Sequence, residues 1–307
     1  MNIDERVGAS FELAPLRETD FDELLALLNE SIGPGHSRTW FDWKHIRNPF
    51  GRSPGWIARD EHGILGIRLM MKWDLVCGTA RIPALRPVDT VTAARARRRG
   101  VFRQLTQLCL GFVEQYPDIK LIFNSPNKSS KPGYEGMGWT ILPGIRHGYK
   151  PVLPRTADLD EADNAFDSFD AMETSNRYST VRNSTILRWR YDKASGRSYG
   201  VARLRQSEAP NGIVYRIISV YGIRIVVVNE LCGKPSERDL LIRAVARKER
   251  AIALLEATGP GAKESIRRIA LTKGVSVLAV RPMQQLNPDP LVLRNWALTL
   301  GDLEGAI

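Results

Sequence analysis

A dense cluster of arginines surrounds one glycine in the N-terminal half of the chain, and these residue types are suited to binding phosphate. The arginines are Arg95, Arg97, Arg98, Arg99 and Arg103, and the glycine is Gly100. Guanidinium groups pair with phosphate oxygens, and a glycine lets the backbone approach an anion closely. Backbone N–H groups at a helix N-terminus bind phosphate as well. A helix that begins directly after Gly100 would therefore complete a site for a ligand with several phosphates.

Two regular patterns flank this arginine cluster. Residues 86–92 are typical of a strand, and an apolar stripe with the period of a helix follows the glycine. The stripe consists of Val101, Leu105, Leu108, Cys109, Phe112 and Val113. The sequence thus predicts a strand, a phosphate-binding loop and a helix between Val88 and Leu110.

A tyrosine and an aspartate supply groups that can move protons. Tyr134 lies in a predicted short helix at residues 127–136, and a phenol with a pKa of about 10 is a suitable donor to a departing thiolate. Asp89 lies on the predicted strand before the arginines and is the candidate base for the proton of an incoming amine. His36 and His147 are rival bases, although an ordinary polar contact explains either of them as well.

The remaining patterns predict an α/β fold. Alternating segments predict strands at residues 10–16, 56–59, 64–73, 86–92 and 120–124, with two more strands before Pro154. Helical spacing predicts helices that begin near residue 19, at residues 38–46, after Gly100 and at residues 127–136. In chain order this is β-α-α-β-β-β-α-β-α-β-β, which is typical of a mixed sheet with helices on both faces.

The arginine–glycine segment resembles a known family. Arg97-x-x-Gly100-x-Phe102 after a strand is similar to the coenzyme A pyrophosphate loop of the GNAT superfamily of N-acyltransferases. That family's pattern is Arg/Gln-x-x-Gly-x-Gly/Ala, so Phe102 departs from it and would leave a shifted or more crowded pyrophosphate site. The segment from Asn127 to Trp139 resembles the family's asparagine-to-tyrosine helix and the glycine–aromatic turn that follows it. The resemblance covers roughly residues 10–150.

The resemblance implies that the chain uses acetyl-coenzyme A, or another acyl-coenzyme A, as a cosubstrate. It places the pyrophosphate at Arg97, Arg98, Arg99, Gly100, Val101 and Phe102. A backbone N–H near Val91 or Thr92 would polarise the thioester carbonyl. Tyr134 would protonate the departing thiolate, and Asn127 would contact the pantetheine arm or cap its helix.

The chain is long enough for two domains, and its composition changes near the middle. Residues 157–173 are rich in aspartate and glutamate, which predicts two domains at residues 1–156 and 157–307. An internal echo indicates that the halves are two copies of one fold. Trp43-Lys44-His45 precedes a Gly-Arg-Ser loop and a strand, and Trp189-Arg190-Tyr191 precedes another such loop and strand.

The second half lacks an arginine–glycine loop. Its corresponding helix opens at Pro235-Ser236, directly after Cys232-Gly233-Lys234. We therefore expect two GNAT-like domains, each a mixed, mostly antiparallel twisted sheet flanked by helices. Only the N-terminal domain would bind acyl-coenzyme A, and the C-terminal domain would be a degenerate copy.

Composition argues against several classes of protein. No apolar run approaches the roughly 20 residues that span a membrane, and the N-terminus has no stretch typical of a secretory signal, so we expect a cytoplasmic protein with no membrane partner. The three cysteines and four histidines show no disulfide or metal-ligand spacing, so we expect no metal. The net charge of +10 fits a phosphorylated ligand, and the basic cluster is too short to favour nucleic acid.

The acceptor is expected to be a primary amine of a small molecule. Residues 31–37 would form its pocket, together with Trp40, Trp43 and Trp139 unless these tryptophans belong to the core. The segments around Trp43 and at residues 296–302 resemble two-domain GNAT proteins associated with bacterial polysaccharide and amino-sugar modification. This resemblance implies an amino sugar or a sugar nucleotide as the leading acceptor.

Two other functions remain open. A GNAT-fold protein without catalysis would bind coenzyme A or another ligand, and a Fem-like tRNA-dependent aminoacyl transferase also has tandem domains of this kind. Tyr134 favours an enzyme over the first alternative, and the arginine–glycine loop favours acyl-coenzyme A over tRNA. The sequence is compatible with a monomer or a homodimer.

Overall fold

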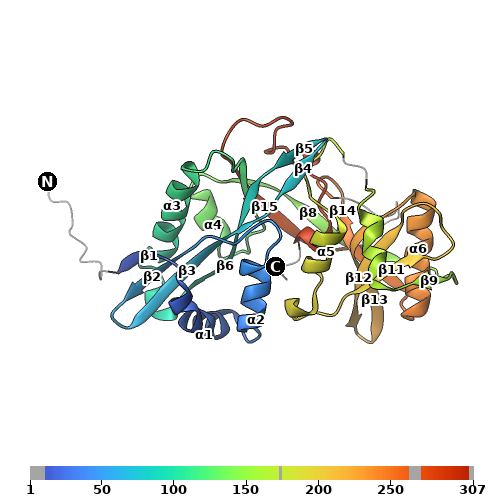
Figure 1. Cartoon of the computed structure of the whole chain (residues 1–307), viewed down its shortest axis with the longest axis horizontal. Helices are drawn as coiled ribbons and strands as arrows, with labels where there is room; N and C mark the ends of the chain where they lie inside the picture. Colours follow the sequence, from blue (N-terminus) through green and yellow to red (C-terminus); the bar gives the residue numbers. More distant parts are fainter. Residues whose placement is uncertain (1–10, 173–174, 263–270, 304–307) are drawn as a thin grey trace. The chain divides into compact units, whose positions relative to one another are not determined.

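The computed structural model describes residues 11–172, 175–262 and 271–303, with the side chains of residues 271–273 also left out (Figure 1). These residues form two compact units. The first comprises residues 11–72 and 85–119, and the second comprises residues 73–84 and 120–303. Within the described residues, no helix is long and apolar enough to cross a membrane.

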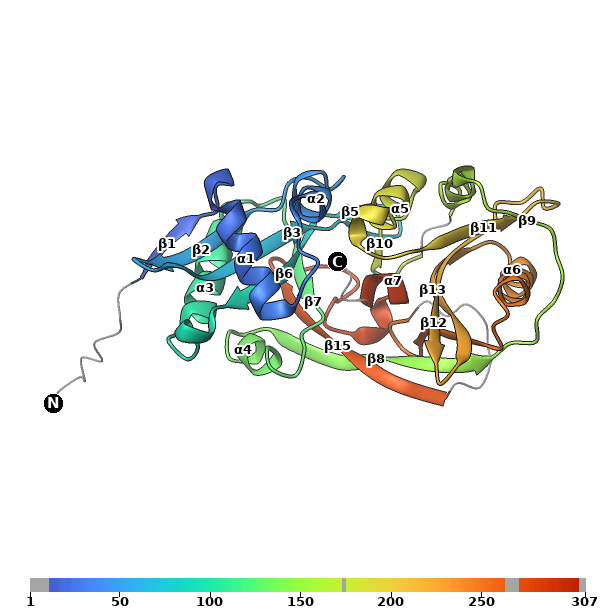
Figure 2. The same cartoon turned by 90° about the horizontal axis from the view of Figure 1, so that it is seen from below.

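The first unit is a four-stranded antiparallel sheet between two layers of helix. Its strands lie in the order β1 (Glu12–Pro15), β2 (Gly55–Asp60), β3 (Gly63–Lys72) and β6 (Ala84–Thr92). Its helices are α1 (Phe21–Ile32), α2 (Arg38–Phe41), the π-helical turn η2 (Asp42–Ile46) and α3 (Val101–Glu114). Short 3-10 turns are η1 (Glu18–Asp20) and η3 (Ala94–Ala96). The helix α3 covers one face of this sheet, and α1 and α2 cover the other (Figures 1 and 2).

Buried apolar side chains hold both helix layers on the sheet. Phe21, Leu24 and Leu28 of α1 are buried, as the helical spacing predicts. On the other face α3 packs closely on β3 at Gly66, where an added Cβ would lie only 2.7 Å from Val101 Cγ1. A glycine at this position lets the first turn of α3 rest directly on the sheet.

The second unit is built on an eight-stranded sheet. Its strands lie in the order β7 (Leu121–Asn124), β15 (Leu271–Pro282), β8 (Thr140–Pro151), β14 (Ala253–Thr258), β13 (Ile223–Cys232), β12 (Gly212–Val220), β11 (Gly200–Leu204) and β9 (Leu159–Asp160). Only β13 and β14 pair in parallel. A small separate sheet contains β10 (Ser179–Thr180), β4 (Leu75–Cys77) and β5 (Ala80–Ile82).

Helices of the second unit are short apart from one. They are α4 (Lys131–Glu135), α5 (Ser184–Arg190), α6 (Pro235–Lys248) and α7 (Leu300–Leu303), with 3-10 turns η4 (Asp163–Phe169), η5 (Lys193–Ser195) and η6 (Leu293–Asn295). The helix α6 packs on the sheet through an apolar cluster that includes Leu241, Ile242 and Val245. The predicted α/β class is confirmed in both units.

Several elements differ from the prediction in length. One continuous strand, β8, replaces the two strands expected before Pro154. The helix expected at residues 38–46 changes from α-helical to π-helical geometry at Asp42, and the helix expected at residues 127–136 is confined to α4. Helical and strand periods locate an element, but its ends depend on capping and pairing partners that lie elsewhere in the chain.

The internal echo extends to the order of elements. The first unit runs β1, α1, α2, β2, β3, β6 and α3, and the second contains β9, η4, α5, β11, β12, β13 and α6 in the same succession. Their strands also pair in the same order, β1-β2-β3-β6 and β9-β11-β12-β13. The compact units do not divide at residue 156 because β8 pairs with β14 and β15 of the later half. The division into residues 1–156 and 157–307 stays a prediction about two copies of a fold.

Candidate functional site

A β-bulge interrupts β6 shortly before the arginine cluster. Val88 pairs with Leu69 and Val91 pairs with Ile67, so two residues of β6, Asp89 and Thr90, lie opposite one residue of β3. Asp89 has a positive φ of 46°, which is uncommon for a residue other than glycine. A bulge turns neighbouring side chains toward different surroundings and often lies beside a functional site.

The carboxylate of Asp89 is bound by two basic side chains from the turn η2. Lys44 Nζ lies 2.7 Å from Oδ2, and His45 Nε2 lies 2.9 Å from the same oxygen. Because an ionised carboxylate only accepts hydrogen bonds, His45 carries its proton on Nε2. Its other nitrogen, Nδ1, lies 3.0 Å from the Ser53 hydroxyl and accepts from it. A buried chain of hydrogen bonds thus leads from Asp89 through His45 to Ser53.

Electrostatics keep Asp89 ionised and His45 neutral. Burial alone would raise the pKa of Asp89, but the Lys44 ammonium and the His45 N–H outweigh burial and hold this pKa well below its usual range. Burial lowers the pKa of His45 and outweighs the attraction of Asp89. A carboxylate whose pKa is held so low is a weak proton acceptor near neutral pH.

On the other side of the bulge, a buried arginine lies against the first turn of α3. Arg68 Nη1 is 3.4 Å from Thr90 Oγ1, and the Arg68 guanidinium lies 4.9 Å from the centre of the Phe102 ring. This distance is typical of a cation–π contact. The ring of Phe102 therefore packs toward β3. The sequence suggested that this side chain would crowd the pyrophosphate site, and in the structure it contacts Arg68 of β3.

The loop before α3 has the geometry that anion binding requires. Gly100 is the N-cap of α3 with a φ of 81°, and no side chain caps the helix. Arg98 also has a positive φ, at 63°. Among the described residues, Arg97, Arg98 and Arg103 make no ion pair, whereas Arg95 is held by Asp60 at 2.8 Å. An uncapped helix N-terminus and three unpaired guanidinium groups therefore lie together at the end of β6.

The sequence of residues 12–142 matches the family described as the acetyltransferase (GNAT) domain. These residues form a GNAT domain. The match includes the bulged strand, the arginine–glycine loop, α3 and the segment up to the start of β8. No curated protein sequence matches the chain.

Solved structures of acyltransferases share the fold over most of the chain. A GCN5-related N-acetyltransferase from Anabaena variabilis has a TM-score of 0.69 at 12% identity and covers 94% of this chain and 81% of that chain. A probable N-acyltransferase from Enterococcus faecalis has the same TM-score at 10% identity, over 89% and 72% of the two chains. N-myristoyltransferase from Saccharomyces cerevisiae, solved with bound myristoyl-coenzyme A, has a TM-score of 0.52 at 10% identity, over 89% and 82%. At these identities the likeness concerns the fold alone.

Within the GNAT domain, the two residues predicted to polarise the thioester lie directly after the bulge. Val91 pairs with Ile67 and Thr92 pairs with Gly66 in the antiparallel ladder with β3. Val91 is buried and Thr92 is half-buried. Their backbone positions are therefore fixed by the strand and lie between Asp89 and the arginine–glycine loop.

Tyr134 and Asn127 belong to the second unit. The Tyr134 side chain is buried, its oxygen accepts a hydrogen bond from Asn124 Nδ2 at 2.9 Å, and its ring packs edge-on against Trp139. A hydroxyl both donates and accepts, so accepting this bond does not use its proton. Asn127 Oδ1 accepts from the backbone N–H groups of Ser129 and Ser130 and thereby shapes the turn that leads into α4.

The tryptophans proposed for the acceptor pocket and His36 make contacts within the protein. Trp40, Trp43 and Trp139 are buried core residues, as one of the two expectations for them stated. His36 Nδ1 lies 2.9 Å from the Gly33 carbonyl, and its ring stacks edge-on against Trp40. The sequence did not identify Lys44 and His45 as partners of Asp89, or Ser53 as the partner of His45, although Lys44 and His45 belong to the aromatic–basic segment of the internal echo.

A counterpart of the bulge is present in the second unit. On β13, Val228 pairs with Tyr215 and Glu230 pairs with Val214, so Asn229 is an extra residue. Glu230 follows this bulge and accepts a hydrogen bond from Tyr191, which corresponds to His45 in the sequence echo. Both copies therefore have a carboxylate at or beside a bulge, and in both it accepts a hydrogen bond from a side chain of the preceding helical segment.

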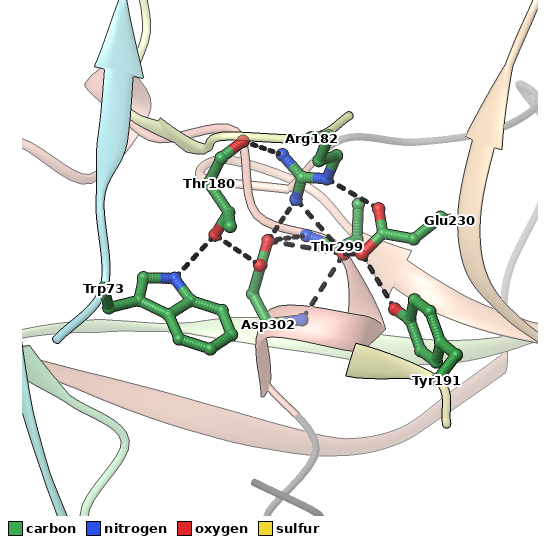
Figure 3. Close-up of polar contacts among 7 residues, drawn as sticks. All are labelled: Trp73, Thr180, Arg182, Tyr191, Glu230, Thr299 and Asp302. Atoms are coloured by element: carbon green, nitrogen blue, oxygen red, sulfur yellow. Dashed lines mark hydrogen bonds and ion pairs between the residues drawn. The ribbon is translucent and has the colours of Figure 1, made fainter. Parts of the chain in front are cut away.

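In the second unit, other side chains of the same unit surround the Glu230 carboxylate. Figure 3 shows the polar residues that meet there: Trp73, Thr180, Arg182, Tyr191, Glu230, Thr299 and Asp302. The Arg182 side chain is only 4% exposed and forms ion pairs with Glu230 at 2.6 Å and with Asp302. Asp302 also accepts from the Thr299 N–H. The segment around α7 therefore closes the position that corresponds to the bulge of the GNAT domain.

Proposed function

We propose that this protein transfers an acyl group from acyl-coenzyme A to a primary amine of a small molecule. The observation that carries the proposal is the uncapped N-terminus of α3, which follows Gly100 and a bulged strand and is flanked by unpaired arginines. Membership of residues 12–142 in the GNAT domain family supports acyl transfer from coenzyme A in general. The bound myristoyl-coenzyme A of the yeast neighbour is consistent with this choice of cosubstrate.

The proposed cosubstrate site uses the arginine–glycine loop for the pyrophosphate. Arg97, Arg98 and Arg99 would pair with phosphate oxygens, while the first-turn N–H groups at Gly100, Val101 and Phe102 would face the anion. Among these arginines, Arg97 and Arg98 are exposed, so an incoming ligand can reach them without opening the core. The N–H of Val91 or Thr92 would then polarise the thioester carbonyl.

In the proposed reaction, the amine nitrogen attacks the thioester carbonyl carbon and forms a tetrahedral intermediate. The carbon–sulfur bond then breaks, the thiolate takes the proton of the Tyr134 hydroxyl, and the surplus proton of the attacking nitrogen passes through water to the Tyr134 oxygen, which leaves the amide neutral and restores the tyrosine. We retain Asp89 as the proposed catalytic carboxylate. Because its pKa is held low, we propose that its negative charge favours the approach of a cationic amine, which gives one proton to water before its nitrogen attacks.

An amino sugar or a sugar nucleotide is the proposed acceptor, and this part rests on the sequence resemblance. The C-terminal half is proposed to be a diverged GNAT-like copy without a cosubstrate site. Two features support this: the second bulge is closed by the segment around α7, and α6 follows β13 after only Gly233 and Lys234. A tandem protein with one working site would result.

Binding and transfer can be tested in sequence. We expect acetyl-coenzyme A to raise the melting temperature, since a ligand at a hundredfold excess over its Kd stabilises by about 2.7 kcal/mol. We then expect release of free thiol with at least one member of a panel of amino sugars, sugar nucleotides, amino acids and polyamines. Arg97→Ala should weaken the stabilisation, whereas Arg247→Ala, in the last turn of α6, is the matched control.

Each alternative has its own outcome in the same experiment. Absence of stabilisation at millimolar acetyl-coenzyme A would contradict the proposed function. Stabilisation without thiol release across the panel would identify a coenzyme A-binding protein without catalysis. Salt-dependent binding to tRNA in place of acetyl-coenzyme A would identify the Fem-like alternative.

A further inference from the structure

The first unit contains a pocket that the proposed reaction does not use. Its volume is about 670 Å³, within the range of sites for small organic ligands. It lies where β1 ends, β2 begins, β3 ends and β6 begins, next to the last turn of α3. Aromatic side chains supply much of its wall, namely Phe21, Phe41, Trp56, Phe112 and Tyr116. Such a wall suits a flat or branched apolar body.

This pocket is separate from the proposed cosubstrate loop. Leu85 of β6 lines the pocket, whereas Val91 lies six residues later along the same strand, just before the loop. At about 3.3 Å per residue, the two positions are roughly 20 Å apart. A molecule in the pocket therefore does not occupy the place of the pyrophosphate or of the thioester carbonyl.

Charge around the pocket favours an anion. Lys72 and Arg52 contribute two cations to the lining, and Asp118 contributes one carboxylate. The Lys72 side chain is half-buried, and among the described residues its ammonium makes no ion pair or hydrogen bond. Arg52 is exposed and has only a long contact of 3.7 Å with Glu18. A partly desolvated cation without a partner gains from an added carboxylate more than a fully hydrated one does.

The floor of the pocket contains the end of the hydrogen-bond chain from the bulge. Ser53 and His45 both line the pocket, and both are buried. Ser53 donates to His45 Nδ1, and His45 donates to Asp89 Oδ2. Ser53 Oγ in the pocket therefore lies two hydrogen bonds away from the Asp89 carboxylate.

We propose that this pocket is a second binding site, for a small amphipathic carboxylate with an aromatic or branched aliphatic body. The body lies among the aromatic side chains, the carboxylate pairs with Lys72, and the ligand contacts the Ser53–His45 end of the chain that fixes Asp89. The site does not depend on the proposed acyl transfer. It stands on a cavity, an unpaired cation and a buried polar chain.

The probe is 4-phenylbutyrate, with the uncharged 4-phenylbutyramide as its matched partner, measured by calorimetry and by ligand-observed NMR. Coenzyme A is present at saturation in a parallel series. We expect saturable binding of the carboxylate, about tenfold weaker binding of the amide, and no competition by coenzyme A. A tenfold ratio corresponds to the loss of one charge-assisted hydrogen bond.

Substitutions inside and outside the pocket test where the two probes bind. Lys72→Met should remove the preference for the carboxylate and leave amide binding nearly unchanged, while Lys128→Met, an exposed lysine of the second unit, should change neither. Ile119→Trp places a large ring in the pocket wall and should abolish binding of both probes in a protein that still melts cooperatively. Failure of wild type to bind either probe at millimolar concentration, or full competition by coenzyme A, would overturn the proposal. So would binding that Lys72→Met leaves unchanged.

Discussion

At the scale of single residues, the proposed role of Asp89 depends on the side chains around its carboxylate. Its carboxylate is paired with the Lys44 ammonium and accepts a hydrogen bond from the neutral His45. All three side chains are largely removed from water, and the bulge of β6 holds Asp89 in a strained backbone conformation. Buried charges of this kind add little net stability when paired but cost a great deal when one partner is removed. Substitution of Asp89 should therefore change both the free energy of unfolding and its dependence on pH.

Substituting Asp89→Asn should lower the free energy of unfolding by about 3 kcal/mol, because the buried Lys44 ammonium loses its partner. Urea unfolding at pH 7 measures this loss. Asp42→Asn removes a carboxylate from a surface pair with Arg38 and should cost less than about 1 kcal/mol. Equal losses in the two variants would show that Asp89 is not the buried partner described above.

The same carboxylate should govern part of the acid sensitivity. The pKa of Asp89 is lower in the folded protein than in the unfolded chain, so its contribution to stability is fully present above the unfolded pKa of about 4. That contribution is lost as the pH falls toward the folded pKa. We expect unfolding free energies measured from pH 6 to pH 2 to fall less steeply for Asp89→Asn than for wild type. A parallel pair of curves would contradict this assignment.

Tyr134→Phe tests the proposed proton donor. We expect turnover to fall about a hundredfold, the lower end of what a positioned acid contributes, while acetyl-coenzyme A still shifts the melting temperature to the same extent. The Asn124–Tyr134 hydrogen bond is also lost, so the melting temperature without ligand serves as a stability control. Tyr221→Phe changes a fully exposed tyrosine and should leave all three measurements unchanged. Unchanged turnover in Tyr134→Phe would remove its proposed role.

At the scale of elements, the proposed cosubstrate site lies at the junction between β6 and α3. The strand ends in a bulge, Gly100 takes a left-handed conformation, and α3 begins without a side-chain cap. An added Cβ at Gly100 would meet only Gln104 Nε2, at 3.7 Å, so the backbone angle and not space requires glycine here. The helix N-terminus is thus presented to a ligand by backbone geometry.

Two glycine substitutions in this region should have opposite effects. Gly100→Ala should destabilise the protein by about 1 kcal/mol and weaken stabilisation by acetyl-coenzyme A, because alanine disfavours a φ of 81°. Gly111→Ala lies in the exposed face of the same helix with open space around it, and should stabilise by roughly 0.5–1 kcal/mol. Thermal unfolding with and without acetyl-coenzyme A measures both. If Gly111→Ala weakens the ligand effect as much as Gly100→Ala does, the loop is not the site.

At the scale of the whole molecule, the two units contain the same order of elements but differ in what surrounds the carboxylate at the bulge. In the first unit the bulge carboxylate faces Lys44 and His45 beside an uncapped helix, whereas in the second Glu230 is enclosed with Arg182 and Asp302 (Figure 3). This buried cluster connects four segments of the second unit: β10, the C-terminal end of α5, β13 and α7. Its ion pairs therefore connect α7 to β13 through Arg182.

Removing the central cation should destabilise the second unit strongly. Arg182→Met leaves Glu230 and Asp302 buried without their counter-ion, and we expect a loss of about 3–5 kcal/mol in urea unfolding. Combining it with Asp302→Asn should recover part of this loss, because one uncompensated charge is removed as well. Strictly additive losses in the double variant would show that the two side chains do not interact.

Sequence alone determined the features that depend on neighbours along the chain. The strand before the arginines, the turn at Gly100, the helix from Val101 and the likeness of the two halves follow from local periodicity, turn chemistry and short motifs. Tertiary structure decided what surrounds each functional group. Lys44 and His45 reach Asp89 across more than forty residues, and Phe102 finds Arg68 on another strand. Such contacts, like the bulge and the length of β8, are fixed by packing and strand register, which no local pattern encodes.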